Sequence, residues 1–110
     1  MDILKKSFEH ISVEEAQALM AREQVQFVDI RDPESYGLSH IEGSVHIDND
    51  NVAGFLDQAD RKKPLIVYCY RGNASQNAAN FFGRHGFERA YSLDGGYNRW
   101  HELSQSGESG

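Results

Sequence analysis

Short apolar segments alternate with helix-type segments along almost the whole chain, and this alternation limits the fold more than any other feature of the sequence. The strand-type segments are rich in branched and aromatic side chains, and the segments between them carry apolar residues at helical spacing. Strands joined by helical crossovers pair in parallel. The sequence therefore predicts a single α/β domain with a central, mostly parallel five-stranded sheet and helices on both faces. The expected strands are residues 8–11, 26–30, 44–47, 65–68 and 89–93.

Local signals place helices between these strands. Ser12 and Glu15 form a capping-box pattern at the start of the first helix. Asn51 is a cap candidate for the third helix, and Gly86 fits the end of the fourth. The expected helices are about 13–23, 33–38, 52–60, 74–86 and 97–103, and the polar segment 104–110 is expected to be a frayed tail.

Apolar spacing also assigns an inner face to each of the longer helices. These faces are expected to pack on the sheet, with both aromatic residues of the last helix in the core. The expected inner residues are Val13, Ala16, Leu19 and Met20; Val52, Phe55 and Leu56; Ala74, Ala78, Phe81 and Phe82; and Tyr97 and Trp100.

Charge and composition exclude several classes of partner. The chain has 110 residues, which suits one domain, and a formal net charge of −6. This charge disfavours nucleic acid or an anionic membrane as a partner, and an anionic substrate must be attracted by local groups. No Cys/His spacing resembles a zinc site, so we expect no metal and no cofactor. Without a secretion-type N-terminus or a long apolar run, a cytoplasmic protein with a reduced thiol is expected.

The only cysteine, Cys69, lies at the end of the apolar segment 65–68. It is either a small buried apolar residue or a nucleophile. Gly72 supplies backbone freedom and Asn73 tolerates left-handed geometry, so the loop after Cys69 can aim successive N–H groups inward. The helix N-terminus that follows and the cation of Arg71 both favour a thiolate. The pattern alone leaves both interpretations open.

A cysteine in such a loop can transfer sulfur or phosphate. In the pattern typical of cysteine phosphatases, a histidine precedes the cysteine, and an arginine six positions after the cysteine clamps the phosphate. Here Tyr68 precedes Cys69, and Ser75 occupies the arginine position. A phosphatase or arsenate reductase would therefore lack its main anion clamp, whereas loop amides and the Ser75 hydroxyl could hold a sulfur oxyanion.

Three motifs together resemble the rhodanese family. VDIRDPESYGLSHIEGS (residues 28–44) is similar to its amino-side signature, CYRGNA (69–74) to its six-residue active-site loop, and DGGYNRW (94–100) to its carboxyl-side signature. The motifs occur in the family's order, and the resemblance covers about residues 8–103. Ser39 and Ser44 stand where glycine and alanine are usual, and both replacements are small.

The resemblance implies thiosulfate sulfurtransferase activity, in which a Cys69 persulfide passes sulfur to cyanide, a thiol, a dithiol or a partner protein. The alternative is a sulfur-carrier or redox-regulatory module of the same fold. The implied substrate-binding residues follow Cys69 directly: Tyr70, Arg71, Gly72, Asn73, Ala74 and Ser75.

The other motif residues have structural or undecided roles. Asp29 and Arg31 either approach the site or tie a strand end to a loop, and His40 is expected to be a hydrogen-bonded structural residue. The turn at residues 94–96 is expected to pack near the active loop.

Overall fold

Strands and helices alternate along the chain as the sequence predicts. The computed structural model describes residues 7–108, and within them every expected strand is present. The strand at residues 65–68 has the predicted limits, and the other four are one or two residues shorter. The Ser12 capping box is confirmed, since the Ser12 hydroxyl accepts from the Glu15 N–H and the Glu15 carboxylate accepts from the Ser12 N–H. The elements are β1 (Glu9–Ile11), α1 (Val13–Met20), β2 (Gln26–Asp29), α2 (Pro33–Leu38), β3 (Val45–His46), α3 (Val52–Gln58), β4 (Leu65–Tyr68), α4 (Ala74–Arg84), β5 (Ala90–Leu93) and α5 (Gly96–Glu108).

The sheet is parallel throughout, with the strand order β1-β5-β4-β2-β3. β4 lies in the middle and all of its residues are buried, as expected for a strand covered on both faces. From β2 the chain continues outward to β3, whereas from β4 it continues to β5 in the opposite direction. The carboxyl ends of β2 and β4 therefore flank the switch point at which open α/β sheets form their binding sites.

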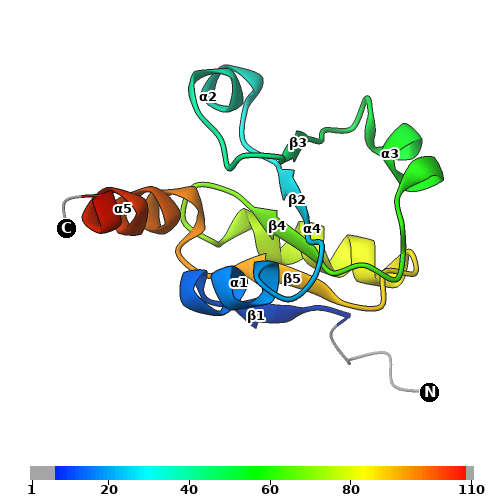
Figure 1. Cartoon of the computed structure of the whole chain (residues 1–110). Coiled ribbons are helices and arrows are strands. Elements are labelled where there is room, and N and C mark those ends of the chain that lie inside the picture. The colour runs from blue at the N-terminus through cyan, green and yellow to red at the C-terminus, as the bar shows by residue number, and fades with distance from the viewer. Residues whose placement is uncertain (1–6, 109–110) are drawn as a thin grey trace.

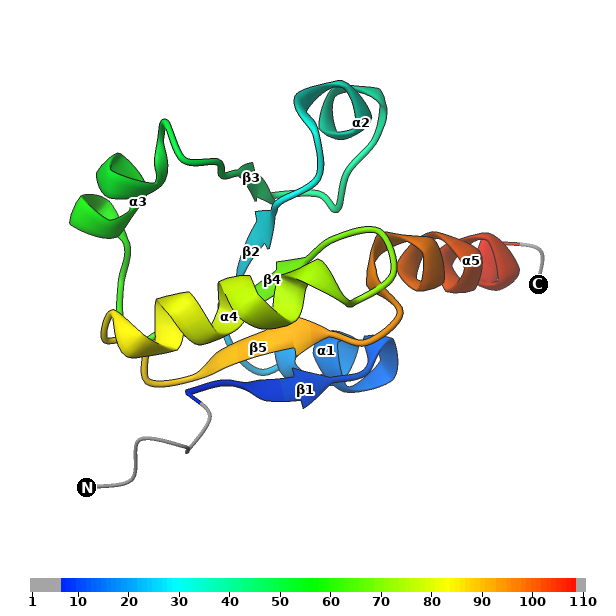
Figure 2. The ribbon, with the colours of Figure 1, turned by 180° about the vertical axis from the view of Figure 1, so that it is seen from behind.

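Helices cover both faces of the sheet, which confirms the predicted fold class. α1 lies in front of the sheet in Figure 1, and α4 lies in front of it in Figure 2, which is seen from behind. Residues of α5 pack with α1 on the first face, and residues of α3 pack with α4 on the second. In β4, Ile66 and Tyr68 belong to the first apolar cluster, and Leu65 and Val67 belong to the second. This alternation directs the next side chain, that of Cys69, toward α4.

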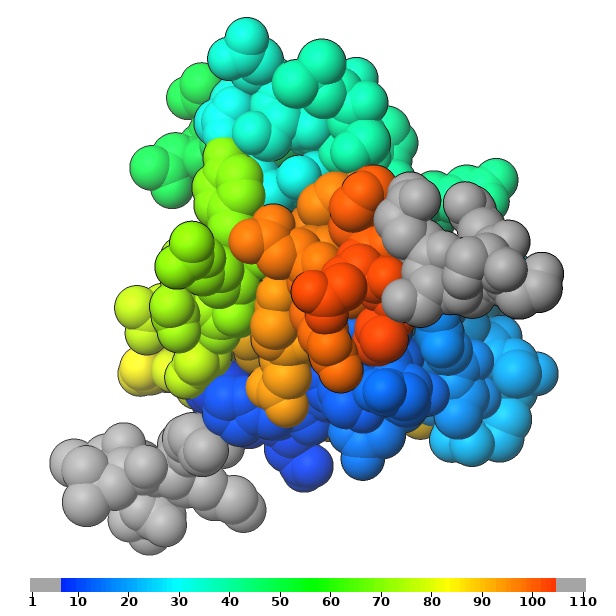
Figure 3. Space-filling model, turned by 90° about the vertical axis from the view of Figure 1, so that its left-hand side faces the viewer, coloured from blue at the N-terminus to red at the C-terminus, as the bar shows by residue number. Residues whose placement is uncertain are grey.

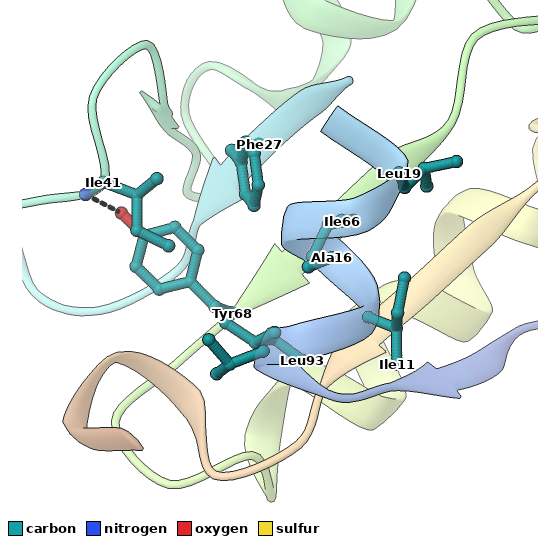
Figure 4. Packing of buried hydrophobic residues seen from close by; sticks show 9 residues of the cluster. Ile11, Ala16, Leu19, Phe27, Ile41, Ile66, Tyr68 and Leu93 are labelled. Carbon is teal, nitrogen blue, oxygen red and sulfur yellow. Dashed lines mark hydrogen bonds between the residues drawn. The ribbon is translucent and has the colours of Figure 1, made fainter. Parts of the chain in front are cut away.

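Tyr68 ties the segment after α2 to the sheet. Its ring lies in the first cluster, as Figure 4 shows, and its Oη accepts a hydrogen bond from the Ile41 N–H at 3.1 Å. The Tyr68 Oη also lies 2.9 Å from Ser44 Oγ. Burial raises the pKa of the Tyr68 hydroxyl above its usual value, so it stays protonated at neutral pH. One side chain thus fixes the turn before β3 against the carboxyl end of β4.

The inner face of α4 differs from the predicted one. Ala74 is exposed and Phe81 keeps 38% of its surface exposed, so the predicted face is wrong at these positions. The polar residue Ser75 is fully buried instead. Spacing alone favoured the row of apolar residues, but the adjacent row faces the sheet because the Ser75 hydroxyl finds partners there. The buried residues of α4 are Ser75, Ala79 and Phe82.

Smaller differences concern helix ends and caps. α1 ends at Met20, before the predicted end at residue 23, and Met20 is 42% exposed. Asn51 stands at the cap position of α3 without bonding the helix, because its side chain binds the Asp48 N–H and the His46 carbonyl instead. α3 ends at Gln58 rather than near residue 60.

The last helix is longer than predicted. α5 continues to Glu108, so the expected frayed tail is helical as far as that residue, and residues 109–110 lie outside the described part of the chain. Tyr97 and Trp100 are half-buried and pack against the first cluster. In the same way, Val52, Phe55 and Leu56 of α3 are half-buried and pack against the second cluster. These predicted inner faces are therefore confirmed, although none of these side chains is fully buried.

Candidate active site

Cys69 follows β4 directly, in the loop that leads into α4 at the switch point of the sheet. Its side chain is 5% exposed. Figure 3 shows this end of the molecule, where the loop (yellow-green), α2 (cyan) and the start of α5 (orange) meet. The prediction that the loop lies at a strand–helix junction is confirmed.

Three hydrogen-bonding groups surround the sulfur of Cys69. The N–H groups of Gly72 and Ser75 donate to Sγ at 3.2 and 3.3 Å, and the Ser75 Oγ lies 3.4 Å from Sγ. Ser75 is the second residue of α4, so its N–H is one of those that a helix leaves unpaired at its start. The loop therefore forms the inward-facing amide cradle that the sequence predicts.

This cradle favours the thiolate. Burial by itself raises the pKa of the Cys69 thiol, but the Ser75 hydroxyl and the backbone N–H groups of Ser75, Gly72 and Arg71 lower it by more. The net pKa lies below the usual thiol value. A buried apolar cysteine would show the opposite direction, so the geometry favours the nucleophile over the filler.

The start of α5 holds the loop carbonyls away from the sulfur. The N–H groups of Tyr97 and Asn98 donate to the carbonyls of Cys69 and Tyr70 at 2.8 and 3.0 Å. Within one trans peptide the C=O and the N–H point to opposite sides. Holding the Tyr70 carbonyl outward therefore turns the Arg71 N–H toward the sulfur, where it helps to lower the pKa of the Cys69 thiol. The predicted contact between the turn at residues 94–96 and the active loop is confirmed.

Two glycines allow this close approach. A Cβ on Gly96 would lie 2.6 Å from the Cys69 and Tyr70 carbonyl oxygens, and a Cβ on Gly72 would lie 2.9 Å from the Gly95 nitrogen. Both glycines have positive φ, 59° at Gly96 and 94° at Gly72. Asn73 has φ of −91°, so the left-handed geometry that asparagine tolerates is not used here, and the positive φ of the turn falls on Gly72. Gln76 braces it, because its side-chain amide donates to the Gly72 carbonyl at 2.9 Å.

Tyr70 anchors the loop to α2. Its hydroxyl donates to the Asp32 carboxylate and lies 3.0 Å from Ser35 Oγ. Asp32 also caps α2 by accepting from the Ser35 N–H. Although Tyr70 is 44% exposed, its polar tip is therefore bound by protein groups rather than free for a substrate.

Asp29 and Arg31 form a buried ion pair below this anchor. The Arg31 guanidinium donates to both Asp29 oxygens, at 2.7 Å from Nη2, and also to the Ser39 carbonyl at 2.7 Å. Burial lowers the pKa of Arg31, but the hydrogen bonds and charge of Asp29 raise it by more. The guanidinium lies 4.2 Å from the Tyr97 ring centre. Of the two roles left open, the contacts show the tie between a strand end and its neighbouring loops.

The remaining predicted residues lie on the open side of the loop. Arg71, Asn73 and Ala74 are exposed, and the structure gives Arg71 no ion pair within residues 7–108. His40 bonds the Tyr36 carbonyl through Nδ1 and stacks on the Tyr36 ring at 3.9 Å, which confirms its structural role.

Sequence reasoning missed two residues near the sulfur. Ser92 of β5 lies behind Ser75, and Gln76 binds the loop from α4. The polar Ser92 in an otherwise apolar strand was the only signal for the first, and none marks Gln76. Over residues 7–108, no group of histidine, cysteine and acidic side chains is arranged to hold a metal ion, and no helix there could span a bilayer.

Fold and site together define a parallel α/β domain with a cysteine sulfur in a cradle of backbone N–H groups, and comparisons with known proteins agree. The family model of the rhodanese-like domain matches residues 12–103. The chain belongs to the rhodanese family.

Two relatives and one structural neighbour match this chain over most of their own length. The thiosulfate sulfurtransferase GlpE of Shewanella oneidensis is 47% identical, over 89% of this chain and 97% of that protein. GlpE of Pseudomonas paraeruginosa is 50% identical, over 91% and 90%. A rhodanese-related protein from Thermoplasma volcanium is 22% identical with a TM-score of 0.73, over 87% and 93%, and this likeness supports the fold alone.

Proposed function

We propose that this chain is a thiosulfate sulfurtransferase in which Cys69 is the nucleophile. The observation that carries the proposal is the Cys69 sulfur, which accepts from the N–H groups of Gly72 and Ser75 in a loop that has no phosphate-clamping arginine. The identity to proteins named thiosulfate sulfurtransferase supports it.

In the first half-reaction the Cys69 thiolate attacks the outer sulfur of thiosulfate. The new bond joins Sγ to that sulfur, the S–S bond of thiosulfate breaks, and sulfite leaves with the electron pair. Cys69 becomes a persulfide whose negative charge sits on the outer sulfur. The inward N–H groups of the loop are already oriented, so they stabilise this charge without reorganising.

In the second half-reaction a thiophilic acceptor attacks the outer sulfur. The Sγ–S bond breaks, and Cys69 leaves as a thiolate. A lowered thiol pKa makes Cys69 a better leaving group, so the cradle assists this step as well. Cyanide serves as acceptor in an assay, and a thiol, a dithiol or a protein thiol serves in the cell.

The site favours a sulfur oxyanion over a phosphate ester. Ser75 takes the place of the arginine that would bind phosphate at two points, and its hydroxyl faces Sγ rather than the open side. Arg71 is the one cation of the loop, and it is exposed. An exposed cation attracts an anion locally although the net charge is −6, and this gives Arg71 its proposed binding role. It shares that role with the backbone of Tyr70, Gly72, Asn73, Ala74 and Ser75.

The single cysteine protects the intermediate. A second nearby thiol would attack the persulfide and discharge it as a disulfide. Cys69 is the only cysteine of the chain and is 5% exposed. A free thiol of this kind persists in a reducing compartment, so we place the protein in the cytoplasm.

Initial-rate kinetics test the proposal. With thiosulfate and cyanide varied together, the two half-reactions predict parallel double-reciprocal lines, and Cys69→Ser should abolish turnover. A phosphate ester serves as the competing substrate. Hydrolysis of that ester without any thiosulfate turnover, or full activity in Cys69→Ser, would overturn the assignment.

A further inference from the structure

Ser92 is a buried polar residue to which the mechanism above gives no role. It lies in β5 beside Val67 of β4, and none of its surface is exposed. Its Oγ lies 2.8 Å from Oγ of Ser75, which is equally buried. Since Ser75 Oγ in turn lies 3.4 Å from Cys69 Sγ, the three side chains form a row that runs from the core of the sheet to the reactive sulfur.

The charge on the sulfur determines the direction of the hydrogen bonds in this row. A thiolate has no proton and can only accept. A hydrogen bond between Ser75 and the thiolate therefore requires the single hydroxyl proton of Ser75 to point to Sγ, and Ser75 Oγ is then left with its lone pairs. Ser92 completes the row by donating its own proton to Ser75 Oγ. With a neutral thiol, the S–H can donate to Ser75 instead, and the whole row can reverse.

We propose that Ser92 is a positioning residue that holds the Ser75 hydroxyl in the orientation that donates to the Cys69 thiolate. The inference rests on the proposed function in that Cys69 is taken as the nucleophile. Ser92 touches neither substrate nor sulfur, and it acts through Ser75 alone.

Two physical effects give Ser92 this role. First, a serine hydroxyl in a helix can instead donate to a backbone carbonyl one turn earlier. The Ser92 hydroxyl, by donating to the lone pairs of Ser75 Oγ, favours the Ser75 orientation that faces the sulfur over this alternative. Second, hydrogen bonds in a chain polarise one another, by roughly 10–30% per bond. Both effects favour the charged form, and both weaken once Sγ becomes the uncharged inner sulfur of a persulfide. The row therefore stabilises the free thiolate more than the intermediate.

The pH dependence of Cys69 alkylation by iodoacetamide tests the proposal, and it needs no thiosulfate. The chain has one cysteine, so the rate reports on this thiolate alone. Ser92→Ala should raise the midpoint of the profile, so that alkylation at a pH below the midpoint slows by roughly threefold to tenfold, since one pKa unit corresponds to a tenfold change in thiolate. Ser44→Ala is the matched control, because Ser44 is also buried but bonds Tyr68 in the other cluster, and it should leave the midpoint unchanged.

A double-variant comparison separates positioning from general packing. Ser75→Ala should raise the midpoint further than Ser92→Ala, and adding Ser92→Ala to Ser75→Ala should change nothing more, because the link to the sulfur is already gone. Ser92→Thr, which keeps the hydroxyl, should retain the parent midpoint. Additive effects of the two alanine variants, an unchanged midpoint in Ser92→Ala, or a threonine variant as shifted as the alanine variant would each overturn the proposal. A parent protein that forms no persulfide would instead refute the proposed function, while the alkylation result would stand.

Discussion

Gly96→Ala is the substitution that most directly tests how α5 holds the active loop. Gly96 has φ of 59°, and an added Cβ would lie 2.6 Å from the carbonyl oxygens of Cys69 and Tyr70. All of these contacts are with backbone, so no side chain can rotate to relieve them. The loop or the start of α5 must move, and the bonds from the Tyr97 and Asn98 N–H groups would be lost or stretched.

The expected loss of stability follows from these contacts. Left-handed backbone costs a residue with a Cβ about 1–2 kcal/mol, and the two hydrogen bonds contribute about 0.5–1.5 kcal/mol each. The free energy of unfolding should fall by about 2–5 kcal/mol, and each kcal/mol lowers Tm by about 4–8 °C in a domain of this size. A displacement of the loop by ~1 Å should lower the sulfur-transfer rate of the folded fraction by up to ~100-fold.

Urea unfolding measures the loss of stability, and thiosulfate turnover together with Cys69 alkylation of the folded protein measures the displacement of the loop. Gly54→Ala is the matched control, since Gly54 lies within α3 and an added Cβ meets nothing within 4 Å. That variant should be as stable as the parent or more stable, by about 0.5–1 kcal/mol. A Gly96→Ala protein with parental stability, or one that is destabilised but keeps the parental alkylation profile of Cys69, would refute the claim that this turn positions the loop.

Three further predictions concern charge and pH. Because the pKa of the Cys69 thiol lies below its usual value, the midpoint of its alkylation-rate profile should lie at a lower pH than that of free cysteine. A midpoint at or above that of free cysteine would contradict the cradle. Arg71→Ala should raise KM for thiosulfate by about fivefold at low salt, which corresponds to ~1 kcal/mol for two charges ~4 Å apart in water, and the effect should be smaller at high salt. The control Arg84→Ala, at the far end of α4, should leave KM unchanged. Equal effects of the two substitutions would mean that only net charge matters. Asp29→Asn leaves the buried guanidinium of Arg31 without its carboxylate and should lower the free energy of unfolding by about 3–5 kcal/mol. A loss below ~1 kcal/mol in urea unfolding would show that the Asp29–Arg31 pair is not buried as described.

The sequence predicts the fold well because its signals are local. The Ser12 capping box, the buried segment at residues 65–68 and Gly86 each act within a few neighbouring residues, and each is found where expected. The cradle around Cys69 is predictable for the same reason, since a glycine, a loop and a helix start are adjacent in the chain. Local chemistry therefore suffices for the elements and for the cradle around Cys69.

Contacts between distant elements were not predictable from spacing. The sequence predicts Ser75 as a substrate-binding residue, but it does not predict its full burial. The hydroxyl of Ser92, brought close by the pairing of β4 with β5, makes that burial favourable. The anchor between Tyr70 and Asp32 likewise joins residues of separate elements whose distance depends on the whole sheet. Polar side chains that pair across elements carry no periodic signal, so a one-dimensional pattern cannot find them.

The mass of the intact protein after exposure to thiosulfate alone tests the central claim most directly. If Cys69 is the sulfur-accepting nucleophile, the chain gains the mass of one sulfur atom, one sulfite is released per chain, and cyanide removes the added mass. Fragmentation should locate the extra sulfur on Cys69, and Cys69→Ser should gain none. A parent protein that turns over thiosulfate without ever carrying this mass, or that carries it at a residue other than Cys69, would contradict the account.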